Sequence, residues 1–88
     1  MTEHEILERT RKFINDSFLY MRPGFVLGDH DKLMEKGVVD SMGVMEVMEF
    51  LESEFGVTPA DDEITEANLG TLAAIARFVA LKRNGASA

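Results

Sequence analysis

Apolar residues recur at helical spacing most clearly between residues 41 and 55, and this segment organises the rest of the chain. Positions three and four residues apart share one face of a helix, so the following residues are expected to face a core: Val44, Val47, Met48, Leu51 and Phe55. Asp40 and Ser41 are both good N-cap types at its start, and Gly56 stands where a left-handed C-cap would end it. The pattern predicts a capped helix with one buried face.

The same spacing predicts a first helix from Thr2, which stands in capping-box spacing with Glu5, to about Tyr20. Its buried side is expected to contain Ile6, Leu7, Thr10, Phe13, Ile14, Ser17 and Phe18. Three basic residues lie off this stripe and are expected to be solvated: Arg9, Arg11 and Lys12.

A last helix is predicted to begin after Thr71 and to end near residue 84. Its core side should contain Leu72, Ile75, Ala76 and Val79, flanked by Phe78. Acidic residues at 61–63 favour the start of one short helix that runs through about Ala67 and is ended by Asn68 and Gly70. Three longer helices and one short helix predict an all-α fold, a four-helix bundle.

The connection after the first helix is predicted to be a loop of roughly sixteen residues, longer than most loops in compact domains. Pro23 and Gly24 end the first helix. Four apolar residues are expected to pin the loop to the core: Phe25, Val26, Leu27 and Leu33. Residues 29–34 can form a short helical turn. A loop of this length is expected to serve a function.

Composition narrows the class of protein. The 88 residues suit one domain, predicted to span 1–84, with 85–88 as a tail expected to fray. A formal charge of −7 excludes a nucleic-acid footprint and favours partners with basic surfaces. There is no cysteine, and no apolar run approaches the length of a membrane span. We therefore expect a cytoplasmic monomer without membrane contact.

The chain has few residues suited to metal binding or catalysis. Four acidic residues near the loop invite a calcium interpretation: Asp29, Asp31, Glu35 and Asp40. Counting an EF-hand from Asp29 puts Leu33 at the fifth position and Met34 where glycine is required, so that register fails. His4 and His30 are the only histidines and have no cysteine beside them, so neither a zinc site nor an enzyme is predicted.

A second set of residues lies on the flank of the central helix: Met42, Met45, Glu46, Glu49 and Glu52. A wide core edge with a solvated charge run would explain this set. A surface for partner proteins would also explain it, because apolar side chains pack against a partner while the glutamates steer basic surfaces toward them.

The motif around Ser41 resembles that of acyl and peptidyl carrier proteins. The resemblance rests on Asp40-Ser41-Met42, on Gly37 four residues before the serine, and on two later stretches, Leu51 to Val57 and Glu63 to Leu69. It implies a non-enzymatic four-helix carrier in which Ser41 bears 4′-phosphopantetheine, derived from coenzyme A, and Asp40 contributes to recognition by the transferase. The implied function is to carry acyl intermediates as thioesters, as in fatty acid biosynthesis.

The resemblance also implies partners. These are a phosphopantetheinyl transferase, a loading ligase and downstream transferases, which would contact the flank residues Met42, Met45, Glu46, Glu49 and Glu52. A fatty chain would enter between the central helix and the last two, and the expected lining is Met45, Val47, Met48, Ile64, Leu69 and Ile75.

Three points leave alternatives open. Gly43 after Met42 is found in D-alanyl carriers, and Glu49 replaces a frequently apolar residue, so an aminoacyl or peptidyl cargo remains possible. An unmodified acidic module that binds a partner is the second alternative. An isolated serine before a helix is most often only an N-cap. Attachment is favoured because a phosphodiester suits a helix N-terminus, and because Gly43 would leave Ser41 open to a modifying enzyme.

Overall fold

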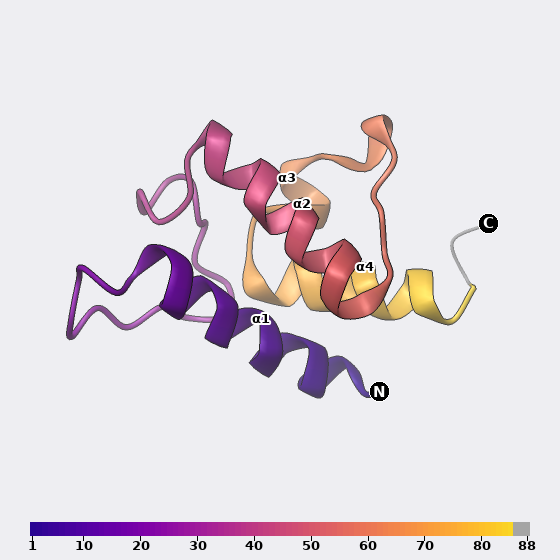
Figure 1. Cartoon of the computed structure of the whole chain (residues 1–88), viewed down its shortest axis with the longest axis horizontal. Coiled ribbons are helices and arrows are strands. Elements are labelled where there is room, and N and C mark those ends of the chain that lie inside the picture. The colour runs from indigo at the N-terminus through magenta and orange to yellow at the C-terminus, as the bar shows by residue number, and fades with distance from the viewer. Residues whose placement is uncertain (86–88) are drawn as a thin grey trace.

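The computed structural model describes residues 1–85, and over that range the chain is helical without strands. Its elements are α1 (Glu3–Phe18), α2 (Ser41–Phe55), the 3₁₀ turn η1 (Asp61–Glu63), α3 (Glu66–Leu69) and α4 (Leu72–Arg83). α1 packs against α4, α2 crosses in front of α4, and the short α3 lies beside α4 (Figure 1). The predicted all-α bundle with one short helix and a long first loop is confirmed.

Local capping explains where the three longer helices begin. Thr2 Oγ1 accepts a hydrogen bond from the N–H of Glu5 (3.1 Å), and Thr71 Oγ1 accepts one from Ala74 (3.0 Å). For α2 the cap is Asp40 alone, because its Oδ1 accepts from the N–H of Gly43 at 2.7 Å and Ser41 is already helical. Of the two N-cap candidates, Asp40 takes this role, and the alternative that Ser41 is a plain N-cap is excluded.

The core is built from the predicted stripes. The largest fully buried side chains come from all three longer helices and are Ile6, Thr10, Ile14, Leu51, Leu72, Ile75 and Val79. Thr10 is satisfied in this apolar setting because its hydroxyl donates to the carbonyl of Ile6 at 2.8 Å. Gly56 ends α2 in the left-handed region (φ 69°), as its position predicted. No helix within residues 1–85 has the length and apolar composition to cross a bilayer.

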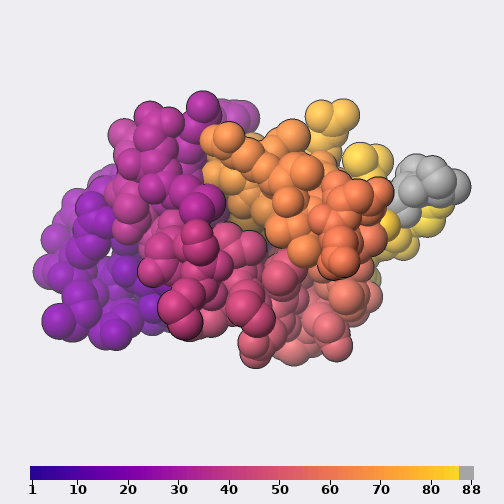
Figure 2. All heavy atoms as spheres, turned by 90° about the horizontal axis from the view of Figure 1, so that it is seen from above, coloured from indigo at the N-terminus to yellow at the C-terminus, as the bar shows by residue number. Residues whose placement is uncertain are grey.

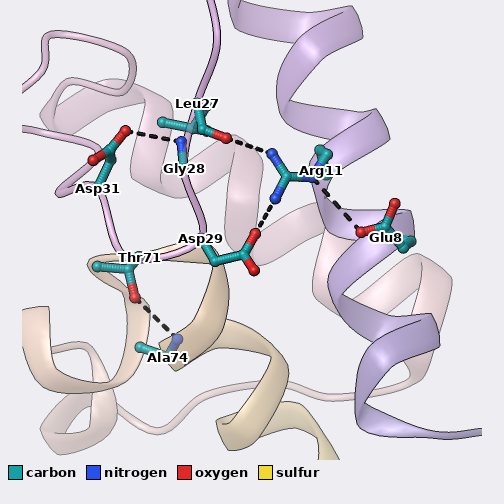
Figure 3. Close-up of polar contacts among 8 residues, drawn as sticks. All are labelled: Glu8, Arg11, Leu27, Gly28, Asp29, Asp31, Thr71 and Ala74. Atoms are coloured by element: carbon teal, nitrogen blue, oxygen red, sulfur yellow. Dashed lines mark hydrogen bonds and ion pairs between the residues drawn. The ribbon is translucent and has the colours of Figure 1, made fainter.

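The long loop is tied to two helices, and Arg11 makes one of the ties. The Arg11 guanidinium donates to the carbonyl of Leu27 and to the carboxylate of Asp29, while Asp31 accepts from the N–H of Gly28 at 2.8 Å (Figure 3). The side chain of Arg11 is only 26% exposed, so the expectation of a solvated arginine is wrong. Arg11 lies one turn before Ile14 on α1, where the loop between α1 and α2 passes close to it. The spacing of residues along α1 does not reveal this contact.

The other tie is made by backbone groups. The N–H of Ala73, at the start of α4, donates to the carbonyl of Asp29, and the N–H of Leu33 donates to the carbonyl of Gly70, both at 2.9 Å. Phe25, Leu27 and Leu33 pack on the core as predicted. Val26 does not, because it is 86% exposed. The helical turn lies later than predicted, closed by a bond of 2.9 Å from the N–H of Lys36 to the carbonyl of Lys32.

The single short helix predicted from residue 61 through Ala67 is in fact two pieces. The 3₁₀ turn ends at Glu63, because the ψ of 78° at the next residue, Ile64, is not helical. Thr65 then caps α3 by accepting from the N–H of Asn68 at 3.2 Å. Asn68 lies inside α3, where its side-chain amide donates to the carbonyl of Glu63 at 2.9 Å, so it does not end the helix. Of the tail predicted to fray, only Gly85 belongs to the described residues.

An ion pair between Glu63 and Lys82 fastens this connection to the end of α4. The carboxylate of Glu63 accepts from Lys82 Nζ at 2.7 Å and from the N–H of Ala60 at 2.9 Å. Both side chains are about one-quarter exposed, at 23% and 24%. The hydrogen bond from Lys82, followed by that from Ala60, lowers the pKa of Glu63 below its ordinary 4.5.

Replacement of Glu63 by glutamine should lower the melting temperature near neutral pH by an amount that shrinks in acid. A lowered folded-state pKa stabilises the protein above about 4.5, and this contribution is lost as the pH falls through the folded-state value. Melting curves of Glu63→Gln and wild type between about pH 7 and pH 3 measure the difference. Asp62→Asn, an exposed neighbour, is the control; a Glu63→Gln deficit of equal size at every pH would contradict the assignment.

Candidate functional site

Ser41 is the first helical residue of α2 and is exposed to solvent. The first intrahelical bond of α2 runs from the N–H of Val44 to the carbonyl of Asp40 (3.1 Å). The N–H groups of Ser41 and Met42 have no helical carbonyl four residues earlier, so they are free to bind an anion at the positive end of α2. The nearest carboxylate, that of Asp40, is directed to the N–H of Gly43. The hydroxyl of Ser41 is therefore exposed to solvent at the N-terminus of α2.

Gly43 has a different role from the one predicted. It is buried, and a Cβ at this position would lie 2.9 Å from Cε1 of Phe18, 3.1 Å from Cγ1 of Val39 and 3.3 Å from Oδ1 of Asp40. The residue lets the end of α1 approach the first turn of α2. The expectation that Gly43 leaves Ser41 open to an enzyme is wrong, because the space beside Gly43 is filled by Phe18.

The end of α1 and the start of α2 share a shallow surface hollow. Its walls include Ser17 and Phe18 on one side and Asp40, Met42 and Glu46 on the other. Ser41 therefore lies at the junction of two elements rather than on an isolated helix tip.

The flank of α2 predicted to meet partners is exposed. Met42 and Met45 are 80% and 61% exposed, and Glu46, Glu49 and Glu52 are exposed as well. Two methionines with this exposure do not belong to the core, so the alternative of a wide core edge is excluded for them. Glu52 also accepts a hydrogen bond from the hydroxyl of Thr58 at 3.2 Å.

A mainly apolar groove lies between α2, the α3 region and the loop that precedes Ser41. Its volume is about 280 Å³, and it is lined by Leu33, Met34, Val39, Val44, Val47, Ile64, Thr65, Glu66, Leu69 and Gly70. The predicted lining residues Val47, Ile64 and Leu69 are found there. Val44, which lies one turn after Ser41, brings the groove close to the N-terminus of α2.

Three predicted lining residues are not in the groove. Met45 is directed to solvent, Ile75 is completely buried in α4, and the half-buried Met48 lies outside the cavity. The sequence interpretation missed the wall supplied by the loop before Ser41. Here the N–H groups of Val38 and Val39 both bond to the carbonyl of Leu33, at 2.9 and 3.2 Å, which folds the apolar residues of the loop under α2. The two apolar pairs Leu33-Met34 and Val38-Val39 were the available signal.

Comparison with protein-family models matches residues 18–79 to the phosphopantetheine attachment site family. The match covers more than half of the chain, the start of α2 included. The chain belongs to this carrier family. It is a non-catalytic carrier whose covalent cofactor is 4′-phosphopantetheine, placed by a phosphopantetheinyl transferase. Comparison with curated proteins found no match.

The start of α2 in this carrier fits such a group. An exposed serine hydroxyl permits attachment, and the free N–H groups of the first turn can stabilise a phosphodiester. The bound arm supplies a thiol for thioester formation, which the cysteine-free chain lacks. Within the described part of the carrier no three His, Cys, Asp or Glu residues are arranged to hold a metal ion, and His4 and His30 are both exposed.

Gly43→Ala should destabilise the carrier by about 1 to 2 kcal/mol, because the close contacts outweigh the better helix propensity of alanine. Shortening the opposing side chain with Phe18→Ala should reduce this cost, since the closest contact of the added Cβ is the Phe18 ring. Denaturant melts of the two single variants and the double variant form the required cycle. An equal Gly43→Ala cost in both backgrounds would show that Phe18 does not impose the glycine.

Proposed function

We propose that the phosphopantetheine arm of this carrier is attached to Ser41 and that the chain carries acyl groups as thioesters on it. The observation that supports this most directly is an exposed serine on the first turn of α2, behind the Asp40 cap and inside the family match. The other serines fit less well. Ser17 lies half-buried at the end of α1, Ser53 lies in the last turn of α2, and Ser87 falls outside the described residues.

In the attachment step the Ser41 oxygen forms a bond to the phosphorus that bears the pantetheine arm of coenzyme A. The pyrophosphate bond of coenzyme A breaks, the adenosine bisphosphate part leaves, and the serine proton passes to a base of the transferase. The contribution of this chain is to present the hydroxyl and to hold the resulting phosphodiester near the first-turn N–H groups of α2. Asp40 holds that turn in place through its bond to Gly43.

An acyl cargo is supported by the groove. Most of its lining is apolar, it begins one turn from Ser41, and burial of each methylene contributes about 0.8 kcal/mol. The aminoacyl alternative rests on Gly43 and Glu49, and neither residue lines the groove. We therefore propose a fatty acyl cargo and a role in lipid metabolism. A cytoplasmic location is also proposed, and the absence of cysteine is consistent with it.

The flank of α2 is proposed as the surface for the loading ligase and downstream transferases. Exposed Met42 and Met45 offer apolar contact area, and Glu46, Glu49 and Glu52 complement basic surfaces on those enzymes. This surface is separate from the groove, so a partner can bind while a chain is enclosed.

Ser41→Ala should abolish the mass gain of a phosphopantetheine arm. The protein would be co-expressed with a phosphopantetheinyl transferase and its intact mass recorded. Ser53→Ala is the matched control, since it removes another exposed hydroxyl from the same helix and should leave the mass gain intact. Persistence of the arm in Ser41→Ala would mean that attachment occurs elsewhere.

Glu46→Lys combined with Glu49→Lys should slow loading or transfer by about tenfold at low salt, through weaker steering, and leave the melting temperature nearly unchanged. The control is Glu3→Lys with Asp62→Lys, which changes the net charge equally at exposed positions away from this flank. Steady-state rates with loading and transfer enzymes give the answer. Equal slowing by both pairs would indicate a general charge effect and no docking surface.

The melting temperature of the acylated carrier should rise with acyl length until the groove is full, because each enclosed methylene stabilises the folded state. Val44→Phe, which places a larger side chain in the groove, should flatten the series. Met48→Phe is the control, since Met48 does not line the groove. Calorimetry of short to medium acyl forms measures the trend, and a flat response in the unaltered carrier would favour the aminoacyl alternative.

A further inference from the structure

The surface hollow between the end of α1 and the start of α2 adjoins Ser41. Its volume is about 310 Å³, and the residues on either side of Ser41, Asp40 and Met42, both line it. The end of α1 contributes Ser17 and Phe18. Because neighbouring Cα atoms lie only about 3.8 Å apart, a group bound to the oxygen of Ser41 starts at the edge of this hollow.

The hollow and the groove are separate cavities on either side of the chain that leads into α2. Within the described part of the chain no residue lines both. Val38 lines the hollow, whereas the next residue, Val39, lines the groove. In Figure 2 the orange atoms of the α3 region, which border the groove, lie apart from the purple atoms around the end of α1, with magenta atoms between them. Ser41 therefore has a cavity on each side.

The two cavities differ in polarity. The groove is mainly apolar, whereas the hollow combines apolar surface with oxygen atoms that can accept hydrogen bonds. Phe18, Val38 and Met42 supply the apolar surface, and the hydroxyl of Ser17 and the carboxylate of Glu46 supply acceptors. Among the hydrogen bonds and ion pairs of the described residues, none involves either of these two side chains. Both acceptors are available to a ligand.

The pantetheine part of the arm matches this combination. It is an uncharged chain whose amide N–H groups donate hydrogen bonds and one of whose carbons bears methyl groups. The N–H groups suit Glu46 and Ser17, and the methyl groups suit the ring of Phe18. Glu46 lies five residues after Ser41, about 7.5 Å along α2, which an extended arm can reach. Because pantetheine carries no charge, the acidic hollow does not repel it.

Covalent attachment makes weak contacts sufficient. A tethered group has an effective concentration of about 1 mM or more at a site within its reach. Contacts that would bind free pantetheine with a dissociation constant of about 1 mM are then enough to fill the hollow about half of the time. A shallow site therefore serves, and an arm held there can still leave.

We propose that the hollow between α1 and α2 is a resting site for the pantetheine part of the arm, in which Glu46 and Ser17 accept hydrogen bonds from its amide N–H groups. This inference rests on the proposed attachment at Ser41. Met42 and Glu46 also belong to the flank of α2 that is proposed to meet partner enzymes, so a bound partner competes with the resting arm for them. Docking on the flank therefore releases the arm toward the enzyme that uses it.

Two other occupants fit the hollow less well. An acyl chain gains more in the groove, because in the hollow it would cover the carboxylates of Asp40 and Glu46 and remove them from water. A free phosphate or another anion would be repelled by the same two carboxylates.

The test is NMR spectroscopy of the full chain without and with its arm, with isotope labels in both the chain and the arm. Nuclear Overhauser contacts should join the methyl groups of the arm to the ring of Phe18 and to the methyl groups of Val38. The amide signals of Ser17 and Phe18 should also move on attachment, although both residues lie on a different helix from Ser41.

Ser17→Ala combined with Glu46→Ala should weaken these contacts about threefold, because both acceptors are lost. Glu46→Gln, which keeps an acceptor oxygen, should retain most of them. The matched control is Ser53→Ala with Glu49→Ala, which removes the same groups from positions outside the hollow and should leave the contacts nearly unchanged. Melting temperatures should stay near the wild-type value, since alanine is well suited to a helix.

Contacts from the arm to Val44 and Val47 would place the arm along the groove and overturn the resting site. An arm that touches only the immediate neighbours of Ser41 would overturn it too, as would an equal loss of contacts in the double variant and its control. In each of these cases a mass gain that depends on Ser41 leaves the proposed attachment standing. A wild-type chain that gains no arm, or an arm that persists in Ser41→Ala, would overturn the attachment and the resting site together.

Discussion

The arrangement depends most on the bonds that fold the long loop back against two helices. Arg11 holds the carbonyl of Leu27 and the carboxylate of Asp29, and the backbone of Asp29 accepts from Ala73 at the start of α4 (2.9 Å). These contacts join α1, the loop and α4 before α2 begins. The N–H of Leu33 then bonds to the carbonyl of Gly70, so the path of the loop also fixes one wall of the groove and the position of Ser41 at the start of α2.

α2 serves several purposes because its surface is divided by rotation around the helix. Leu51 and Phe55 enter the core, Val44 and Val47 line the groove, and Met42 and Met45 face solvent. A helix turn repeats every 3.6 residues, so residues adjacent in sequence fall into different environments. The same element can therefore expose Ser41, line the groove and present an acidic flank on different sides.

The distribution of charge gives α2 an acidic flank. Several basic side chains are engaged within the described chain, as Arg9 is with Glu54 (2.7 Å) and Arg83 is with the carbonyl of Phe55 (2.8 Å). Glu46, Glu49 and Glu52 are left exposed on the flank of α2, which is the surface proposed to meet basic regions of partner enzymes.

The sequence by itself determined the features that depend on nearby residues. Helix spacing, the Thr2 and Thr71 caps and the Gly56 stop depend on neighbours a few positions away, and all were predicted correctly. The motif at Asp40 and Ser41 led to the carrier family, and residues 18–79 match it.

Only the tertiary structure decided the features that depend on the path of the loop. Gly43 is needed because the ring of Phe18, 25 positions earlier, packs against it. The side chain of Arg11 is held by the carbonyl of Leu27, 16 positions later in the loop. The groove likewise takes Leu33, Met34 and Val39 of its lining from the loop before α2, whereas Ile75 is too deeply buried to reach it. Periodicity states which side of a helix is apolar, but it does not state which apolar side chains meet another element and which border a cavity.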